Sequence, residues 1–319
     1  MAIYHLSVKP VQRSKGRSAT AAAAYRAAER IVDERTGEIH DYRRRGGVDH
    51  AEIVGWSGTR SELWNAAEKA ERRKDGTPAR EYEIALPREL DREQREELAR
   101  EYAQWLHERH GVAVDVCIHG HDTDNPHAHL LATTRVVDAQ GQSLGDKAAV
   151  EWSDRKRKQH GMEGRKTELA AARETWQNLA NKALERAGQA ERIDHRTLEA
   201  QRTEAMEKGD VERAAKLDRE PQNKIGWAAQ KMERAGFESD RGREHRERKE
   251  RNAERQGLYT RLRETVHSMA IDGIEAFKQR YEQVQRGIAA FKERAEKYQE
   301  RQHEQARRRS RGHDRGMEL

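Results

Sequence analysis

The stretch "VAVDVCIHGHDTDNPHAHLLATTR", residues 112–135, decides the fold. Two apolar runs, 112–119 and 127–137, flank a polar loop with the turn formers Gly, Asp, Asn and Pro, which predicts two strands that return antiparallel. His127 and His129 are two positions apart, so on a strand their side chains leave the same face. The return of the chain then brings His119 alongside that pair.

This arrangement of histidines is that of metal ligands. Three neutral imidazoles on one side of a divalent ion leave positions open for a substrate, as a catalytic site requires. Apart from Cys117 the sequence has no thiol, which argues against a structural zinc site and leaves Mg²⁺ or Mn²⁺ open. His121 lies in the loop, and we expect it not to be a ligand. The alternative is that all four are ordinary strand and loop histidines.

The rest of the N-terminal half alternates strand and helix patterns. Capping signatures at Ser18, Thr59 and Asp91 begin three predicted helices. The order predicts an α+β fold, an antiparallel sheet with helices packed on one face, followed by an extended, largely helical C-terminal tail. The predicted helices are 18–34, 59–76, 91–111 and 166–188, and the predicted strands are 2–9, two within 35–56, 80–87, 112–119 and 127–137.

Composition supports one modest core. Of 319 residues, 34% are hydrophobic and 38% charged, although the length alone suggests about two domains. We therefore expect a compact domain over residues 1–205 and a charged helical, coiled-coil tail over 206–319 with a disordered basic end from 307. The net charge of +6 favours a polyanionic partner such as nucleic acid.

The tail carries apolar residues at alternating spacings of three and four, typical of a coiled-coil seam. Such a helix packs on a second copy, on the upstream segment 258–269 or on another protein; a solvated single helix is the alternative. No apolar run approaches the length of a membrane span, so we expect no membrane insertion and a location in the bacterial cytoplasm. The seam residues are Ile274, Phe277, Tyr281, Val284, Ile288, Phe291, Ala295 and Tyr298.

Five segments, in this order, carry a family resemblance: "AIYHLSVK", "GRSATAAAAYR", "EYEIALPREL", "IHGHDTDNPHAHL" and "RIDHRTLEAQ". Together they resemble the MobA/MobL (MobQ-type) plasmid mobilisation relaxases of the HUH endonuclease superfamily, from residue 1 to about 205. The resemblance implies a metal-dependent relaxase that nicks one DNA strand at a plasmid transfer origin and later rejoins it. Tyr25 matches the family's nucleophile, which forms a 5′-phosphotyrosine, and His119, His127 and His129 match its metal ligands.

Further site residues follow from the resemblance and from charge. Glu81 and Glu83 share one face of a strand, and we expect one of them near the metal or the tyrosine, with a solvent-facing position as the alternative. Basic residues around Tyr25 are expected to hold DNA phosphates, although each can equally be a solvated surface charge. These are Arg13, Lys15, Arg17, Arg26, Arg43, Arg44 and Arg45.

By resemblance, the partners are single-stranded or supercoiled plasmid DNA at the transfer origin, accessory mobilisation proteins and a type IV secretion coupling protein. Self-association through the coiled coil is a further expectation. Two alternative functions remain: an HUH rolling-circle replication initiator or transposase, and a non-catalytic DNA-binding coiled-coil scaffold in which the histidines bind a structural ion.

Overall fold

The computed structural model describes the backbone of residues 2–272 and 274–314, and their side chains except those of 266–278, 303 and 305–314. The chain divides into two compact units, Met1–His195 and Arg196–Leu319. The boundary that the sequence predicts, between 205 and 206, instead falls inside helix α6 of the second unit.

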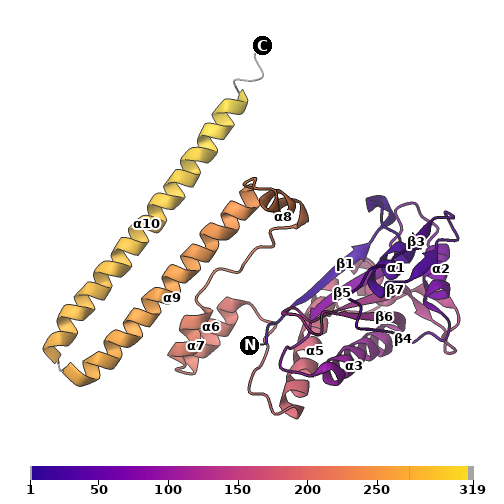
Figure 1. Cartoon of the computed structure of the whole chain (residues 1–319), viewed down its shortest axis with the longest axis horizontal. Helices are drawn as coiled ribbons and strands as arrows, with labels where there is room; N and C mark the ends of the chain where they lie inside the picture. Colours follow the sequence, from indigo (N-terminus) through magenta and orange to yellow (C-terminus); the bar gives the residue numbers. More distant parts are fainter. Residues whose placement is uncertain (1, 273, 315–319) are drawn as a thin grey trace. The chain divides into compact units, whose positions relative to one another are not determined.

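The first unit is built on one antiparallel sheet of strand order β1-β5-β7-β6-β4, with β8 paired to β7, and a separate hairpin of β2 and β3 (Figure 1). Four larger helices accompany the sheet, and the α+β class is confirmed. The strands are β1 (Leu6–Val11), β2 (Arg30–Val32), β3 (Ile39–Asp41), β4 (His50–Val54), β5 (Ala79–Ala85), β6 (Val112–His119), β7 (His127–Val137) and β8 (Leu144–Lys147). The helices are α1 (Ala19–Ala27), α2 (Arg60–Ala70), α3 (Arg92–His110), α4 (Asp154–Gln159) and α5 (Arg165–Arg186).

Helices cover both faces of the sheet, so the prediction of helices on one face is wrong. On one face of the sheet, Tyr102 of α3 and Trp176 of α5 are buried in an apolar cluster with Val116 of β6. On the other face, α1 and α2 bury a second apolar cluster that includes Trp64 and Leu131. The physical reason is visible in β6: all eight of its residues are buried, as expected of a central strand covered on both sides.

Helix α1 is shorter than its alanine-rich sequence predicts. Ser18 caps its start, accepting from the Ala21 amide, but Ala28 takes a left-handed conformation at φ 52° and ends the helix. The following residues form β2 rather than a continued helix, because branched Ile31 and Val32 pair with β3 and Ile31 is fully buried.

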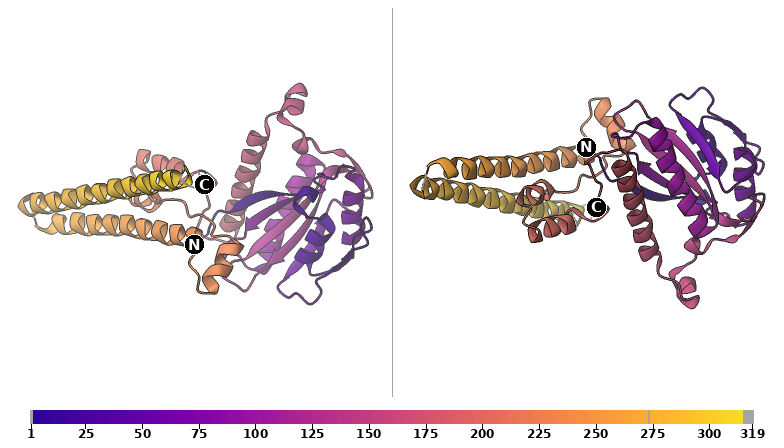
Figure 2. Two further views of the ribbon diagram at one scale, coloured as in Figure 1. Left: turned by 90° about the horizontal axis from the view of Figure 1, so that it is seen from above. Right: turned by 90° about the horizontal axis from the view of Figure 1, so that it is seen from below.

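The second unit is helical: α6 (Leu198–Glu207), α7 (Val211–Leu217), α8 (Trp227–Arg234), α9 (Asp240–Asp272) and α10 (Ile274–Asp314). Helices α9 and α10 lie side by side as a hairpin (Figure 2). The helix that lies beside the predicted apolar seam of α10 is therefore the upstream one, α9, which contains the segment 258–269. Tyr298 donates to Glu247 across this pair. The side chains of Ile274 and Phe277 lie outside the described residues.

Helix α10 continues as far as Asp314, into the basic end for which the sequence predicts disorder. Arginine, which dominates residues 307–311, is a favourable helix former. Residues 315–319 lie outside the described part of the chain.

A buried ion pair joins α2 to the central strand. The Arg60 guanidinium donates from Nε to both oxygens of Asp115, at 2.9 and 3.0 Å, and also contacts Glu29. Trp64 donates to the same carboxylate at 2.8 Å. Because Asp115 is 1% exposed, its removal leaves the buried Arg60 guanidinium with Glu29 alone and the Trp64 indole N–H without this acceptor.

We predict that Asp115→Ala lowers the free energy of unfolding by about 3–5 kcal/mol, the usual cost of breaking a buried ion pair by removing one partner. Urea denaturation followed by tryptophan fluorescence measures this change. The matched control is Asp41→Ala, which breaks an exposed pair with Arg43 and should leave stability unchanged. Equal stability of the two variants would contradict the prediction.

Candidate metal centre and tyrosine pocket

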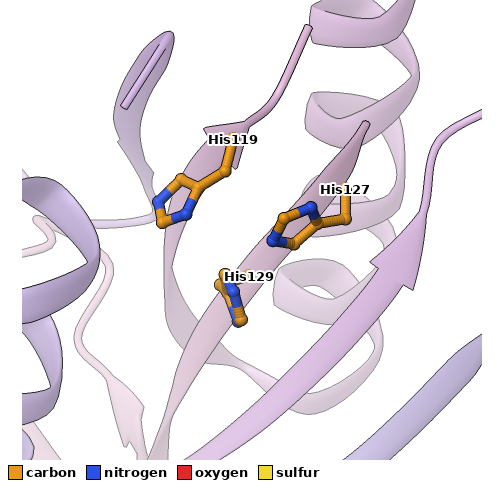
Figure 3. A group of neighbouring side chains, drawn as sticks. All are labelled: His119, His127 and His129. Carbon is orange, nitrogen blue, oxygen red and sulfur yellow. The ribbon is translucent and has the colours of Figure 1, made fainter. Parts of the chain in front are cut away.

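The three predicted histidines converge where the two inner strands β6 and β7 meet the loop that joins them (Figure 3). Residue His119 ends β6 and lies in register with His127 of β7, while Cys117 lies in register with His129. The imidazole ring centroids are 5.1–5.5 Å apart, and one nitrogen from each ring lies within 4.8 Å of the other two. These three residues, here called the histidine triad, therefore form a group that can hold a metal ion.

Each imidazole is held by a hydrogen bond from its other nitrogen. Nε2 of His119 donates to the Arg26 carbonyl at 2.8 Å, and Nδ1 of His127 donates to the Asn125 carbonyl at 2.8 Å. Nδ1 of His129 donates to Oε1 of Glu81 at 2.7 Å. These bonds fix the tautomers and leave Nδ1 of the first ring and Nε2 of the other two for an ion, the usual outer-shell arrangement around metal-binding histidines.

Two imidazoles of the triad, those of His119 and His127, are unprotonated at pH 7. Burial lowers the pKa of His119 to about 4, and the charges of the neighbouring histidines add to this effect. Burial likewise lowers the pKa of His127. A metal ion binds the unprotonated ring, so at pH 7 it need not displace a proton from these two residues.

Of the two glutamates on β5, Glu81 contacts the triad. It is 4% exposed and accepts from Arg26 as well as from His129. Burial acts to raise the pKa of Glu81, but the hydrogen bond from His129 and the charge of Arg26 outweigh it and lower the value to about 2. Glu83 shares the same strand face and pairs instead with Lys9 at 2.5 Å and His5 at 3.3 Å.

Tyr25 lies on the outer face of α1 and lines a pocket of about 730 Å³ that also contains Glu81, Glu83 and His129. Its side chain is 45% exposed, because the alanines of the opposite helix face are the ones buried against α2. The Arg45 guanidinium lies 3.7 Å above the Tyr25 ring and donates to the Tyr25 carbonyl. The structure thus brings the predicted tyrosine and part of the predicted metal centre into one pocket.

The predicted DNA-binding residues differ in their surroundings. All three guanidinium nitrogens of Arg13 donate to Glu68 or to backbone carbonyls, and Arg26 donates to Glu81 and to the Ala22 carbonyl. Arg17 is exposed on the wall of the pocket. Lys15, Arg43 and Arg44 are exposed beside it, and Arg43 pairs with Asp41.

Several pocket residues escaped the sequence analysis, among them Lys9, Arg35 and Tyr42. The ring of Tyr42 meets that of Tyr25 edge to face, with centroids 5.2 Å apart. The sequence contains a pattern that could have identified Lys9: it alternates with core-facing Val8 on β1 and so points to the pocket side. No pattern in the sequence identifies Arg35, since only the β2–β3 hairpin brings it to the pocket.

Fold and site together define an α+β protein with a histidine triad beside a pocket tyrosine. The sequence profile of the MobA/MobL family matches residues 17–235, more than half of the chain. The chain belongs to the MobA/MobL family, and the resemblance read from its five segments is confirmed.

Two relatives and one solved structure illustrate the similarity. The chain is 40% identical over 316 residues to "Mobilization protein MobL" of Acidithiobacillus ferridurans, covering 88% of this chain and 79% of that protein. It is 31% identical to "Probable mobilization protein MobA" of Bifidobacterium longum (strain NCC 2705), covering 77% of this chain but 47% of that protein. A structure described as "Molecular Basis of Vancomycin Resistance Transfer in Staphylococcus aureus" matches with a TM-score of 0.51 and 33% identity, covering 61% of this chain and 99% of its own.

Within the described residues, every helix is too short or too polar to cross a membrane.

We predict that Glu81→Gln weakens Mn²⁺ binding by roughly 10- to 100-fold, the usual effect of removing an outer-shell partner of a metal-binding histidine. Isothermal titration calorimetry measures the affinity. Glu83→Gln is the matched comparison, because Glu83 lies on the same strand face and pairs with Lys9 and His5, whereas Glu81 accepts a hydrogen bond from His129. The assignment of Glu81 is wrong if both variants lose affinity equally.

Proposed function

We propose that this protein is a mobilisation relaxase that nicks one strand of plasmid DNA at a transfer origin. Tyr25 attacks a phosphodiester, forming a bond from its phenol oxygen to phosphorus while the bond to the 3′ oxygen breaks. The products are a 5′-phosphotyrosine and a free 3′ hydroxyl, and attack by such a hydroxyl reverses the step and rejoins the strand. The ester keeps the energy of the cleaved bond, so rejoining needs no ATP.

The observation that carries the proposal is the pocket in which Tyr25, Glu81 and His129 meet. Of the two ions expected from the sequence, Mg²⁺ and Mn²⁺, Mn²⁺ fits the triad better, because it accepts imidazole ligands whereas Mg²⁺ prefers oxygen ligands and water. When bound, such an ion supplies positive charge opposite the non-bridging phosphate oxygens.

The pocket residues divide the remaining tasks. A phenol has a pKa near 10 and must lose its proton as it attacks. Glu81 is buried and bound to His129 and Arg26, so we assign the role of proton acceptor to Glu83, which pairs with Lys9 and His5 but is the more exposed of the two on the same pocket wall. The Arg45 guanidinium lies over the Tyr25 ring and keeps that side chain in position.

The basic residues around the pocket provide the affinity for DNA. We assign phosphate binding to the exposed residues Lys15, Arg17, Arg43 and Arg44, with Arg45 at the tyrosine. Arg13 and Arg26 use their donors within the protein, so their part is to hold Glu68 and Glu81 in place. Phosphate contacts of this kind carry no sequence information, and recognition of the origin requires contacts to bases.

The proposed role in plasmid transfer, and the partners proposed with it, rest on the relatives. Both relatives are named as mobilization proteins, which favours a role in plasmid transfer over rolling-circle replication or transposition. By the same argument we propose accessory mobilisation proteins and a type IV secretion coupling protein as partners. A non-catalytic DNA-binding scaffold is the rival that the next experiment excludes or supports.

We predict that Tyr25→Phe abolishes the covalent DNA adduct while leaving DNA binding largely intact, because only the attacking oxygen is lost. The protein is incubated with supercoiled plasmid carrying its origin and Mg²⁺ or Mn²⁺, and protein attached to a 5′ end is detected after denaturation. Tyr42→Phe, which removes the neighbouring phenol of the same pocket, should keep the adduct. An adduct that persists in Tyr25→Phe refutes the nucleophile, and its absence from the wild-type protein supports the scaffold.

We also predict that a chain ending at residue 210 still cleaves a single-stranded origin oligonucleotide at a rate close to that of the full chain. The sheet, the triad and the tyrosine pocket all lie within the first unit, Met1–His195. Gel analysis of cleavage under single-turnover conditions tests this. Complete loss of cleavage in a chain that still binds DNA would show that the second unit takes part in the chemistry.

A further inference from the structure

A second, basic hollow adjoins the tyrosine pocket. It has a volume of about 430 Å³, and most of its wall belongs to the loop 71–76 that follows α2. Arg13 and Arg35 line both this hollow and the tyrosine pocket, so the two spaces share a wall. We call the hollow and the adjoining part of the pocket the basic groove. The hollow is lined by Arg13, Arg35, Glu71, Arg72, Arg73 and Lys74.

Arg13 fixes the loop in this place. Its Nη1 donates to the carbonyl of Glu71 at 2.6 Å and to that of Arg73 at 3.2 Å. The backbone amide of Arg13 also donates to the carbonyl of Gly76 at 3.2 Å. The loop 71–76 is therefore fastened to the segment that leads into α1, the helix that carries the tyrosine, and its side chains extend from an anchored backbone.

The carboxylates of the loop already have cationic partners. Oε1 of Glu71 lies 2.9 Å from Nζ of Lys147 and 3.2 Å from Nε of Arg135. Asp75 pairs with Arg73 at 2.9 Å. The negative charges of the loop are thus compensated by these partners, and the other basic side chains of the hollow keep their positive charge for a ligand.

Three cationic side chains of the groove are placed to bind an anion. Arg72 and Lys74 are exposed and form no ion pair with any residue that the structure describes. Arg35 is 44% exposed, and its Nε lies 3.6 Å from the buried carboxylate of Glu68, which Arg13 approaches more closely at 2.6 Å. Positive charge without a compensating carboxylate attracts a polyanion, and a groove lined with such charge fits a chain of phosphates.

We infer that the basic groove holds the DNA strand next to the nick. Arg35 binds a phosphate close to the one that Tyr25 attacks, and Arg72 and Lys74 bind phosphates farther along the same strand. The inference rests on the proposed function, because it takes the scissile phosphate to lie in the tyrosine pocket. His129 lines that pocket but not the hollow, so the strand passes from the candidate metal centre, past the tyrosine, to the loop.

The hollow supplies affinity rather than recognition of sequence. Among the described residues that line it, none is aromatic, so it offers no ring on which a base can stack. Contacts from guanidinium and ammonium groups to phosphates fix the position of a strand without reading its bases. The ligand that fits the hollow is therefore the sugar–phosphate backbone of a single strand, whatever its sequence.

The test is binding of oligothymidine without a metal ion, so that its outcome does not depend on nicking. Fluorescence anisotropy measures the affinity of the full chain for labelled strands of about 4 and about 16 nucleotides, lengths that span the usual range of single-strand sites. Arg72→Ala with Lys74→Ala should weaken binding of the longer strand roughly tenfold at low salt. Binding of the shorter strand should weaken much less, because it reaches one part of the groove at a time.

Salt dependence gives a second measurement. The double change should lower the slope of log affinity against log salt by about 1.4, because each phosphate contact to a single strand contributes about 0.7. The matched control, Arg155→Ala with Lys158→Ala, removes the same two charges from exposed residues of α4 that line neither space. It should keep both the affinity and the slope of the wild type.

The inference is overturned if the variant at Arg72 and Lys74, shown by circular dichroism to be folded, binds the longer strand as tightly as the wild type. It is also overturned if the control variant loses as much affinity, because the effect then comes from net charge and not from the groove. A wild-type protein that binds the strand but forms no adduct through Tyr25 would contradict the proposed nicking and leave the binding result in place.

Discussion

The pairing of β6 with β7 is the constraint on which the rest of the site depends. It sets His119 opposite His127 and places His129 on the same face two residues on. Side chains alternate along a strand, so a slip of one residue would move the histidines of one strand to the core side. The register is held by the core itself, because Val116 and Leu130, which are partners across the two strands, are both fully buried. The packing that stabilises the sheet therefore also assembles the triad.

The same central strand holds the tyrosine helix in place. The carbonyl of Arg26, next to Tyr25, accepts from His119 at the end of β6. Just beyond the helix, Glu29 contacts Arg60, whose guanidinium is bound to Asp115 in the middle of β6. Helix α1, which carries Tyr25, and the histidine triad are thus joined through hydrogen bonds to one strand, so the packing of the fold itself holds the pocket in place.

Some predictions from sequence were wrong for reasons that lie in long-range packing. The alanines of α1 predicted a longer helix, but a left-handed residue and the pairing of β2 with β3 end it at Ala27. For Arg13, a candidate for phosphate binding, the fold adds what charge alone does not show: Glu68 and backbone carbonyls surround its guanidinium. Neither outcome is visible locally, because the partners are supplied by segments distant in the chain.

The sequence by itself determined the strand pair, the common face of His127 and His129 and the family. These follow from the two-residue repeat of a strand and from motifs that are local in the chain. Only the tertiary structure decided which glutamate meets the triad, that Arg45 covers Tyr25, and that helices cover both faces of the sheet. The reason is that two neighbours on one strand face, such as Glu81 and Glu83, have the same local pattern, and only the elements packed against them distinguish their contacts.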